Sequence, residues 1–130
     1  MKMVYVAGPY RGPTAWAVEQ NIRAAEAYVL DVAKAGCVPL CPHTMFRYFD
    51  GTMTADFWLV ATMELLKACD AAIFVNRWES SEGAQAELKA AVWMRMPVWV
   101  WRPEGVGSGM DLGQFLVGVR EGTLYRPDDP

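Results

Sequence analysis

Apolar residues occur along this chain with two different spacings. Short runs of β-branched and aromatic residues are typical of strands, and longer segments with apolar positions three or four apart are typical of helices. The clearest helical segment is expected to follow a cap at Thr14 and to continue to Lys34, with Gly36 ending it in a left-handed conformation. Its apolar face comprises Val18, Ile22, Ala25, Val29 and Val32.

The pattern predicts strands that alternate with helices. The expected strands are residues 2–7, 37–41, 70–75 and 97–101. Further helices are expected from a cap at Thr54 or Asp56 to Cys69, from a cap at Ser81 to Arg95, and over residues 111–119, with loops at 43–53 and 103–110. This alternation is typical of parallel βαβ units with right-handed crossovers. The sequence therefore predicts an α/β fold, a small doubly wound parallel sheet of four or five strands, in one domain over residues 1–130.

The composition fits one domain with a substantial core. Of 130 residues, 53% are hydrophobic, and six are tryptophan and eight methionine. No apolar run approaches the ~20 residues that span a bilayer. The first residues run directly into Gly8 and Pro9 and lack the layout of a signal peptide. We therefore expect a cytoplasmic protein without a membrane partner.

Charge and cysteine content narrow the possible ligands. The formal net charge is −3 and no stretch is rich in lysine or arginine, which argues against binding to a nucleic-acid polymer. A small anionic ligand needs only one or two basic groups and stays possible. Cys37, Cys41 and His43 could be imagined as zinc ligands, but the two cysteines fall in an expected strand and a fourth ligand is missing nearby. We expect neither a metal nor another cofactor.

Residues with useful chemistry follow the expected strands at their carboxyl ends. In an open parallel sheet these ends meet at one edge, where ligands bind. Residues 8–12 follow the first strand, His43 the second, residues 76–82 the third, and Arg102 and Glu104 the fourth. Asp70 begins the third strand, so we expect it about 15 Å away, at ~3.3 Å per residue, in a structural role.

The loop after the first strand reads Gly8-Pro9-Tyr10-Arg11-Gly12. The two glycines let backbone N–H groups approach a ligand, and the Arg11 guanidinium can hold a phosphate with two donors. The alternative is a surface arginine in a turn. We favour the binding role because the loop lies at the carboxyl end of a strand.

The segment from Ser81 to Glu87 opens the helix after the third strand. Ser81 and Gly83 at a helix N-terminus make an anion site, because the first backbone N–H groups lack partners within the helix. Glu87 directs a carboxylate toward the same place, and its helical neighbours Ala84 and Ala91 are small and apolar. This favours a catalytic role, although an acidic residue near a helix N-terminus is also simply stabilising.

The role of Tyr5 stays open, and the motifs of two nucleotide-binding classes are missing. Tyr5 alternates with Val4 and Val6, which fits core packing on a buried strand, but its phenol could equally hydrogen-bond a carboxylate at the site. The loop from Gly105 to Gly109 lacks the G-x-G-x-x-G spacing, so a flexible loop is favoured over a dinucleotide site. The sequence also has no phosphate-loop motif of the nucleoside triphosphatases.

Three segments, in order, resemble the nucleoside 2-deoxyribosyltransferase superfamily, which includes the deoxynucleoside 5′-monophosphate N-glycosidases. They are Val4-Tyr-Val-Ala-Gly-Pro-Tyr-Arg11, Leu65-Leu-Lys-Ala-Cys-Asp-Ala-Ala-Ile-Phe-Val75 and Ser81-Glu-Gly-Ala-Gln-Ala-Glu87. The resemblance covers roughly residues 2–101, and the chain is most similar to bacterial and phage members of unknown function.

The resemblance implies cleavage or transfer at the N-glycosidic bond of a (deoxy)nucleoside 5′-monophosphate. It implies that Glu87 is the carboxylate nucleophile and that Tyr5 orients it. Such a bond breaks through an oxocarbenium-like state that a carboxylate can stabilise or capture. The positions that it assigns to the 5′-phosphate are Gly8, Arg11, Ser81 and Gly83. Pro9 and His43, at the same edge, complete the candidate substrate-binding residues.

One position departs from the pattern of that superfamily. Thr62 occupies the place of an aspartate that contacts the leaving base or the sugar. Glu64 lies roughly 200° round the helix and cannot simply replace it. Asp50, Asp56 or His43 could supply an acid instead. The alternative function is a non-catalytic module that binds a nucleotide or sugar phosphate in the same cradle.

Aromatic residues suggest self-association. Phe57, Trp58, Trp93 and Trp101 could serve a subunit interface, where aromatic residues and methionine are enriched, or each could belong to the core. A domain of this size has few places to bury six tryptophans. We therefore expect a homo-oligomer.

Overall fold

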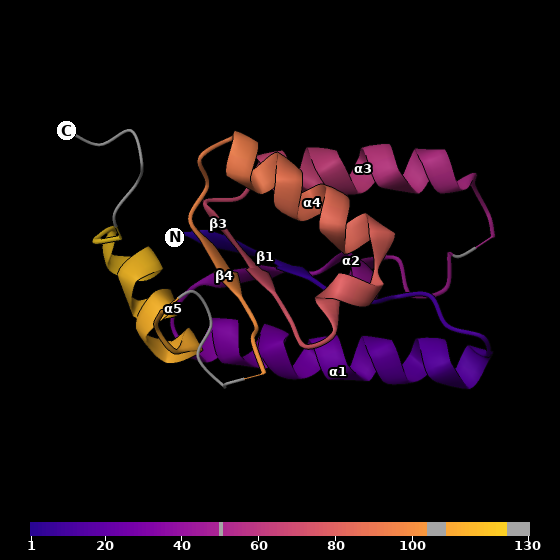
Figure 1. The fold of residues 1–130 in the computed structure, drawn as a ribbon, viewed down its shortest axis with the longest axis horizontal. Coiled ribbons are helices and arrows are strands. Elements are labelled where there is room, and N and C mark those ends of the chain that lie inside the picture. Colours follow the sequence, from indigo (N-terminus) through magenta and orange to yellow (C-terminus); the bar gives the residue numbers. More distant parts are fainter. Residues whose placement is uncertain (50, 104–108, 125–130) are drawn as a thin grey trace.

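Four parallel strands form the centre of the protein (Figure 1). The computed structural model describes residues 1–49, 51–103 and 109–124. Within these, the strands are β1 (Met3–Ala7), β2 (Val38–Leu40), β3 (Ala71–Phe74) and β4 (Val98–Val100). Their order is β2-β1-β3-β4, and each neighbouring pair is parallel. The predicted α/β fold with a parallel sheet is confirmed.

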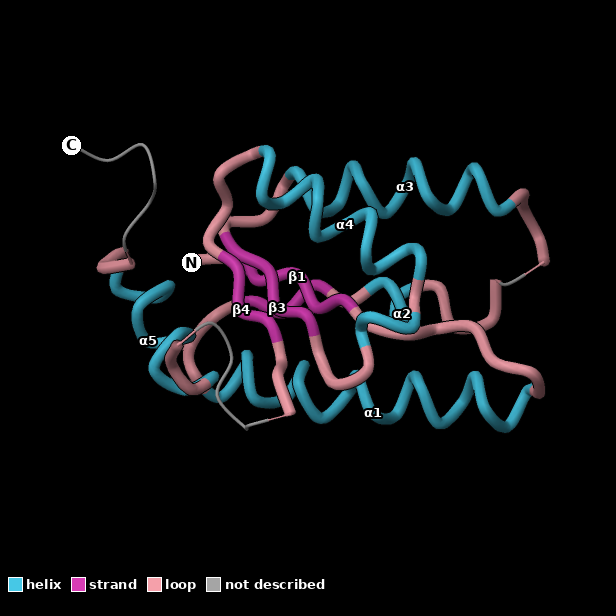
Figure 2. Tube along the Cα trace, viewed as in Figure 1, coloured by secondary structure: helices cyan, strands magenta, loops and turns pink. Residues whose placement is uncertain are grey.

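Helices cover both faces of the sheet (Figures 1 and 2). Two of them, α1 (Ala15–Lys34) and α5 (Leu112–Glu121), pack on one face, and α3 (Ala55–Lys67) and α4 (Glu82–Trp93) pack on the other. No helix in the described ranges has both the length and the apolar character needed to cross a membrane.

Strand β1 divides its side chains between the two faces. Val4 and Val6 belong to the core beneath α1 and α5, whereas Tyr5 and Ala7 belong to the core beneath α3 and α4. This is the two-residue alternation of a strand that is buried on both faces. It places Tyr5 on the same side of the sheet as α4.

Helix starts follow the predicted caps. The hydroxyl oxygens of Thr14, Thr54 and Ser81 accept hydrogen bonds from the backbone N–H groups of Ala17, Phe57 and Ala84 at 3.0, 3.1 and 3.1 Å. Each bond satisfies one N–H group that the helix leaves unpaired. Gly36 follows α1 with a φ of +87°, as expected for a residue that ends a helix in the left-handed region.

The segment between β2 and α3 departs from the prediction. The sequence predicts a loop over residues 43–53, but the chain forms the short helix α2 (Pro42–Met45) at its start. Pro42 stands in the first turn, where a missing N–H group costs nothing, and Cys41 makes no side-chain cap. A helix this short shows no apolar period, and the same is true of the 3₁₀ turn η1 (Trp78–Ser80) before α4.

The strand order places a topological switch between β1 and β3. The chain leaves β1 toward β2 on one side and later returns to add β3 on the other. Ligands of doubly wound sheets bind outside the carboxyl ends of the strands at such a switch. Here the two strand ends approach closely: a Cβ atom on Gly8 would lie 2.4 Å from Cγ2 of Val75, so only glycine fits.

Candidate functional site

A tyrosine from the middle of β1 meets a glutamate from α4. Tyr5 is only 1% exposed and Glu87, from α4, is 9% exposed. Their side chains are hydrogen-bonded to each other. Tyr5 therefore combines the two roles that the sequence left open, because it packs in the core and also contacts a carboxylate.

The environment of this pair changes its acidity. Burial raises the pKa of Glu87 from 4.5 to about 7, and the hydrogen bond from Tyr5 opposes that rise. Burial, and then the negative charge of Glu87, raise the pKa of Tyr5 above its ordinary range, so the phenol stays a donor. Among the described residues, Oε2 of Glu87 is buried and has no hydrogen-bond partner. The carboxylate thus keeps one acceptor unused.

The other Glu87 oxygen lies beside the first turn of α4. A Cβ atom on Gly83 would stand 4.0 Å from Oε1 of Glu87 and 3.8 Å from Oγ of Ser81. The absent side chain of Gly83 therefore leaves space between the helix N-terminus and the carboxylate. The sequence predicts this proximity, and the structure confirms it.

Thr62 places a further hydroxyl group beside the pair of Tyr5 and Glu87. Its side chain is within hydrogen-bonding reach of the Tyr5 hydroxyl and stands 3.1 Å from the carbonyl oxygen of Leu59. Its contact with Tyr5 is a tertiary one that the sequence does not reveal. Glu64, by contrast, is exposed and pairs with Lys67 at 3.3 Å, as expected for a residue on the far side of α3.

Asp70 has the structural role that the sequence predicts for it. It precedes β3, and its Oδ2 atom accepts a hydrogen bond from the backbone N–H of Met3 at 2.7 Å. This bond ties the start of β1 to the start of β3, at the sheet edge away from Glu87. Asp70 is therefore excluded from the candidate site.

The loop after β1 is held by a residue that sequence reasoning missed. The Asn21 side-chain amide, on α1, donates to the carbonyl oxygens of Tyr10 and Arg11 at 3.1 and 3.2 Å. Its Oδ1 atom accepts a hydrogen bond from Nη2 of Arg77, which follows β3, at 2.8 Å. The signal was available, since Asn21 falls between Val18 and Ala25 on the apolar face of α1. The Arg11 side chain itself is exposed.

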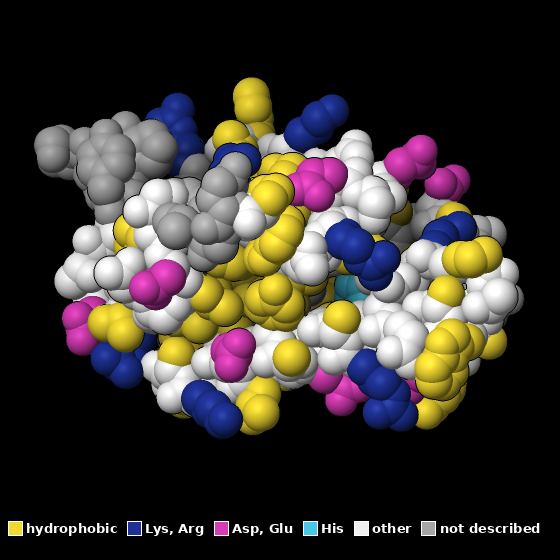
Figure 3. Space-filling view, turned by 60° about the horizontal axis from the view of Figure 1, so that its bottom comes forward, with side chains coloured by type: hydrophobic (Ala, Val, Ile, Leu, Met, Phe, Trp, Pro, Cys, Tyr) yellow, Lys and Arg dark blue, Asp and Glu magenta, His cyan; other side chains and the backbone are white. Residues whose placement is uncertain are grey.

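His43 holds the loops after β1 and β2 together. It is 7% exposed, and its Nε2 atom stands 2.9 Å from the carbonyl oxygen of Pro9, to which it must donate. Burial lowers the pKa of His43, and its Nδ1 atom has no partner among the described residues. Its ring meets the edge of Tyr10 with 5.4 Å between centroids. Only a small area of the histidine (cyan) is visible on the face in Figure 3.

No metal cluster occurs in the part of the chain that the structure describes. Three or more His, Cys, Asp or Glu side chains do not converge anywhere within it. Cys37 and Cys41 are buried, and Sγ of Cys37 lies 3.9 Å from the carbonyl oxygen of Leu116. Burial raises the pKa of Cys41 to about 11, which keeps the thiol protonated and unreactive at neutral pH.

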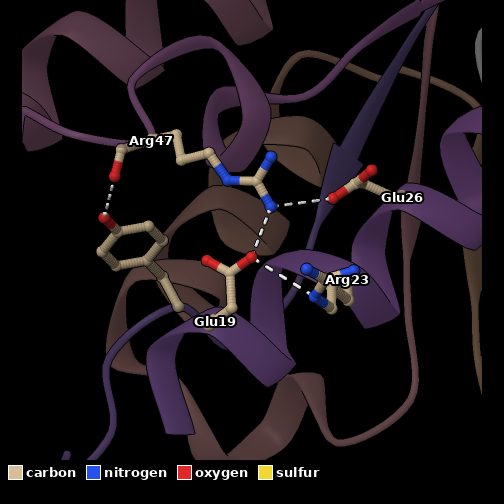
Figure 4. A network of polar contacts seen from close by, with 5 residues as sticks. Glu19, Arg23, Glu26 and Arg47 are labelled. Atoms are coloured by element: carbon tan, nitrogen blue, oxygen red, sulfur yellow. Dashed lines mark hydrogen bonds and ion pairs between the residues drawn. The ribbon is translucent and has the colours of Figure 1, made fainter. Parts of the chain in front are cut away.

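An ion-pair network supports the loops around the site (Figure 4). Nη2 of Arg47 contacts Glu19 at 2.8 Å and Glu26 at 3.1 Å, and Arg23 pairs with Glu19 at 3.3 Å. The Tyr10 hydroxyl lies 3.5 Å from the carbonyl oxygen of Arg47. The network thus fastens the segment after α2 to α1.

The remaining candidates among the described residues lie at or near the surface. Pro9 is half-buried beside His43, and Arg102 and Asp56 are exposed. Asp50, Glu104 and most of the loop from Gly105 to Gly109 lie outside the described residues.

These features define a small parallel α/β protein with a buried tyrosine–glutamate pair beside the switch point of its sheet. Residues 2–101 match the family described as "Domain of unknown function (DUF7768)". That match spans well over half of the chain, so the chain belongs to this family. No curated protein matches it.

Proposed function

We propose that this protein cleaves or transfers the N-glycosidic bond of a (deoxy)nucleoside 5′-monophosphate, with Glu87 as the nucleophile. The observation that carries the proposal is the hydrogen-bonded pair of Tyr5 and Glu87, whose carboxylate adjoins the open first turn of α4. The resemblance of three segments to the nucleoside 2-deoxyribosyltransferase superfamily supports the same assignment.

The proposed reaction uses two displacements at the anomeric carbon. A Glu87 oxygen bonds to C1′ while the C1′–N bond breaks, and the electron pair of that bond goes to the base, which takes up a proton from solvent. Water, or a second base in a transfer, then attacks C1′ and loses a proton. The C1′–O bond to Glu87 breaks, and the free carboxylate returns. Tyr5 orients the carboxylate by donating its phenolic proton to it.

The local chemistry favours these roles. A pKa of about 7 leaves about half of the Glu87 side chains ionised at neutral pH, and the ionised form is the nucleophile. Oε1 of Glu87 adjoins the space that Gly83 leaves open in the first turn of α4, so this oxygen is the one placed to attack. The backbone N–H groups of the first turn of α4, with Ser81 and Gly83, are suited to hold the 5′-phosphate. Arg11 would add a charged donor from the loop after β1.

A substrate panel tests the proposal. The protein is incubated with ribo- and deoxyribonucleoside 5′-monophosphates of the common bases, and released base is separated and quantified. We expect at least one monophosphate to yield free base and a sugar phosphate, and Glu87→Gln to slow this release on the order of 10³-fold or more. Glu64→Gln, on the exposed side of α3, is the matched control and should retain the wild-type rate. Absence of turnover, or equal turnover by Glu87→Gln, contradicts the proposal.

A second function is favoured by one specific observation. Thr62 stands beside Tyr5, where the resemblance implies an aspartate, and a hydroxyl is too weak an acid to protonate a leaving base. The protein would then bind a nucleotide or sugar phosphate without cleaving it. This alternative predicts that nucleoside monophosphates raise the melting temperature, that Arg11→Ala and Ser81→Ala abolish the rise, and that no base is released. Efficient hydrolysis of a bound nucleotide contradicts it.

The proposed setting is the cytoplasm. The three cysteines, Cys37, Cys41 and Cys69, are free and buried, which suits a reducing compartment. The proposed chemistry uses a small-molecule nucleotide and requires no cofactor, nucleic-acid polymer or membrane. Fractionation of the host cell, followed by detection of the protein, would test this location.

A further inference from the structure

Two arginines without an acidic partner stand on the loops after β1 and β3. Within residues 1–49, 51–103 and 109–124, the ion pairs to carboxylates involve neither Arg11 nor Arg77. Both residues are exposed. In a chain with a net charge of −3, unpaired positive charge at the ligand-binding edge of the sheet favours an anionic ligand.

Asn21 connects these two arginines through a single amide. Its nitrogen donates to the carbonyl oxygen of Arg11 at 3.2 Å, and its oxygen accepts from the Arg77 guanidinium at 2.8 Å. Asn21 is 8% exposed and lies on α1, so it is a rigid anchor. The Arg77 side chain therefore reaches from the end of β3 to α1, where Asn21 joins it to the loop that follows β1. It spans the switch point, where a ligand of this sheet is expected.

Within the described part of the chain, the Arg77 side chain bonds to Asn21 alone, which leaves most of its donors unused. A guanidinium has five N–H donors in a planar fork, and the contact with Asn21 engages Nη2. The remaining donors have the geometry that matches two phosphate oxygens. Because Asn21 already fixes the side chain, little further rotamer freedom is lost when an anion binds.

The backbone of Arg77 is also unusual. Its φ of +66° lies in the left-handed region, where glycine is at ease and a residue with a Cβ atom is not. Arg95 shares this feature with a φ of +57°, but it directly follows the C-cap of α4, where helices often end in this way. Arg77 instead begins η1, and its conformation accompanies a side chain that crosses to α1.

We propose that Arg77, positioned by Asn21, is a second phosphate-binding arginine of this site, and that with Arg11 it selects phosphorylated ligands over unphosphorylated ones. This inference rests on the proposed function for the identity of the ligand, a nucleoside 5′-monophosphate. It goes beyond that function by giving a phosphate-binding role to Arg77, which the sequence placed only within the segment 76–82 at this edge.

Two arginine-to-glycine variants test the inference as a matched pair. Arg77→Gly removes the guanidinium and suits the left-handed backbone, so the variant should fold. Arg95→Gly makes the same change in the same backbone region at the opposite edge of the sheet. Dissociation constants for a deoxynucleoside 5′-monophosphate and for the matching nucleoside are measured by calorimetry. Thermal shifts with inorganic phosphate provide a probe that is independent of the nucleotide.

We expect Arg77→Gly to weaken binding of the monophosphate by about 10- to 100-fold, as loss of a charge-assisted contact does, and to leave nucleoside binding unchanged. Arg77→Lys keeps the charge but loses the fork, so it should fall between wild type and Arg77→Gly. Arg95→Gly should bind both ligands as the wild type does.

The outcomes separate this inference from the proposed function. Wild-type affinity of Arg77→Gly for the monophosphate overturns the role of Arg77, whether or not base is released. Loss of the phosphate-induced thermal shift in Arg77→Gly, with no base release by the wild type, supports Arg77 and contradicts the glycosidase. If the wild type binds neither inorganic phosphate nor any monophosphate, both are wrong.

Discussion

Glu87 is held in the folded protein at a cost that depends on pH. Its pKa is raised from 4.5 to about 7, so the folded state favours the protonated carboxyl. The contribution of the protonated Glu87 carboxyl to the stability of the folded state is fully present below about pH 4.5. It is lost as the pH rises through 7. At 1.36 kcal/mol per pKa unit, the loss amounts to about 3 kcal/mol. A residue kept at such a cost is typical of a functional site.

Glu87→Gln should therefore stabilise the protein at alkaline pH. The amide has the shape of the carboxyl and does not ionise, so its advantage over the wild type should grow between pH 5 and 8 by up to about 3 kcal/mol. Thermal unfolding of both proteins across this range measures the difference. Parallel stability curves for wild type and variant would show that Glu87 has an ordinary pKa.

Tyr5→Phe should change the pH dependence of the proposed reaction. The hydrogen bond from Tyr5 lowers the pKa of Glu87, so its removal raises that pKa further. Because the ionised carboxylate is the nucleophile, the rising limb of kcat/KM near pH 7 should move to higher pH, with a loss of about tenfold at neutral pH. A pH–rate profile checks both effects. An unmoved limb would mean that Tyr5 is only a core residue.

Residues that act through neighbours in sequence could be predicted, and residues that act through tertiary contacts could not. The place of Glu87 on a small, apolar helical face can be predicted because Ala84 and Ala91 are one turn away. The contacts of Thr62 with Tyr5 and of Asn21 with Arg77 join residues 57 and 56 positions apart. No local period records such contacts, so only the folded chain reveals them.

At the scale of elements, α4 is the part of the fold that the site depends on most. Its cap, Ser81, and its buried face were predictable because capping and helical period are local rules. The helix α2 was not predictable, since it has four residues and no side-chain cap. His43 is nevertheless oriented by α2, which explains why its bond to Pro9 could not be foreseen.

Gly83→Ala should separate stability from binding. A Cβ atom there would meet its nearest neighbours at 3.8 and 4.0 Å, which is ordinary contact, and Gly83 has no positive φ. Alanine also favours a helix over glycine, so the melting temperature should stay equal or rise. The added methyl group would fill the space above Glu87 and weaken binding of a monophosphate, which calorimetry measures.

Gly8→Ala is the informative contrast to that variant. Its Cβ atom would lie 2.4 Å from Cγ2 of Val75, so the Val75 side chain or the strand ends must shift and the protein should lose stability. If Gly83→Ala binds a monophosphate with wild-type affinity, the first turn of α4 does not contact the ligand.

For the whole molecule, strand order decides where chemistry gathers. The alternation of strands and helices predicts a doubly wound sheet, but the order β2-β1-β3-β4 follows from how the layers pack and not from any one segment. That order brings β1 and β3 side by side and so joins segments that are some 70 residues apart in the chain. The sequence predicts that candidate residues gather at the carboxyl edge of the sheet. It does not predict which of them contact each other there.

The apolar surface of α3 and α4 leads to a prediction about assembly. We propose that the chain forms a homo-oligomer through this surface. Trp93 is 86% exposed, and Val92 and Val60 are also exposed, whereas Trp58 and Trp101 are half-buried. Exposed aromatic and aliphatic groups on adjoining helices are typical of an interface.

Light scattering at micromolar concentration should give at least twice the monomer mass, and Trp93→Lys should lower that mass. Trp16→Lys, a control at a 72% exposed tryptophan on α1, should leave the mass unchanged. A monomeric wild type would contradict the oligomer, and an equal effect of both variants would place the interface elsewhere.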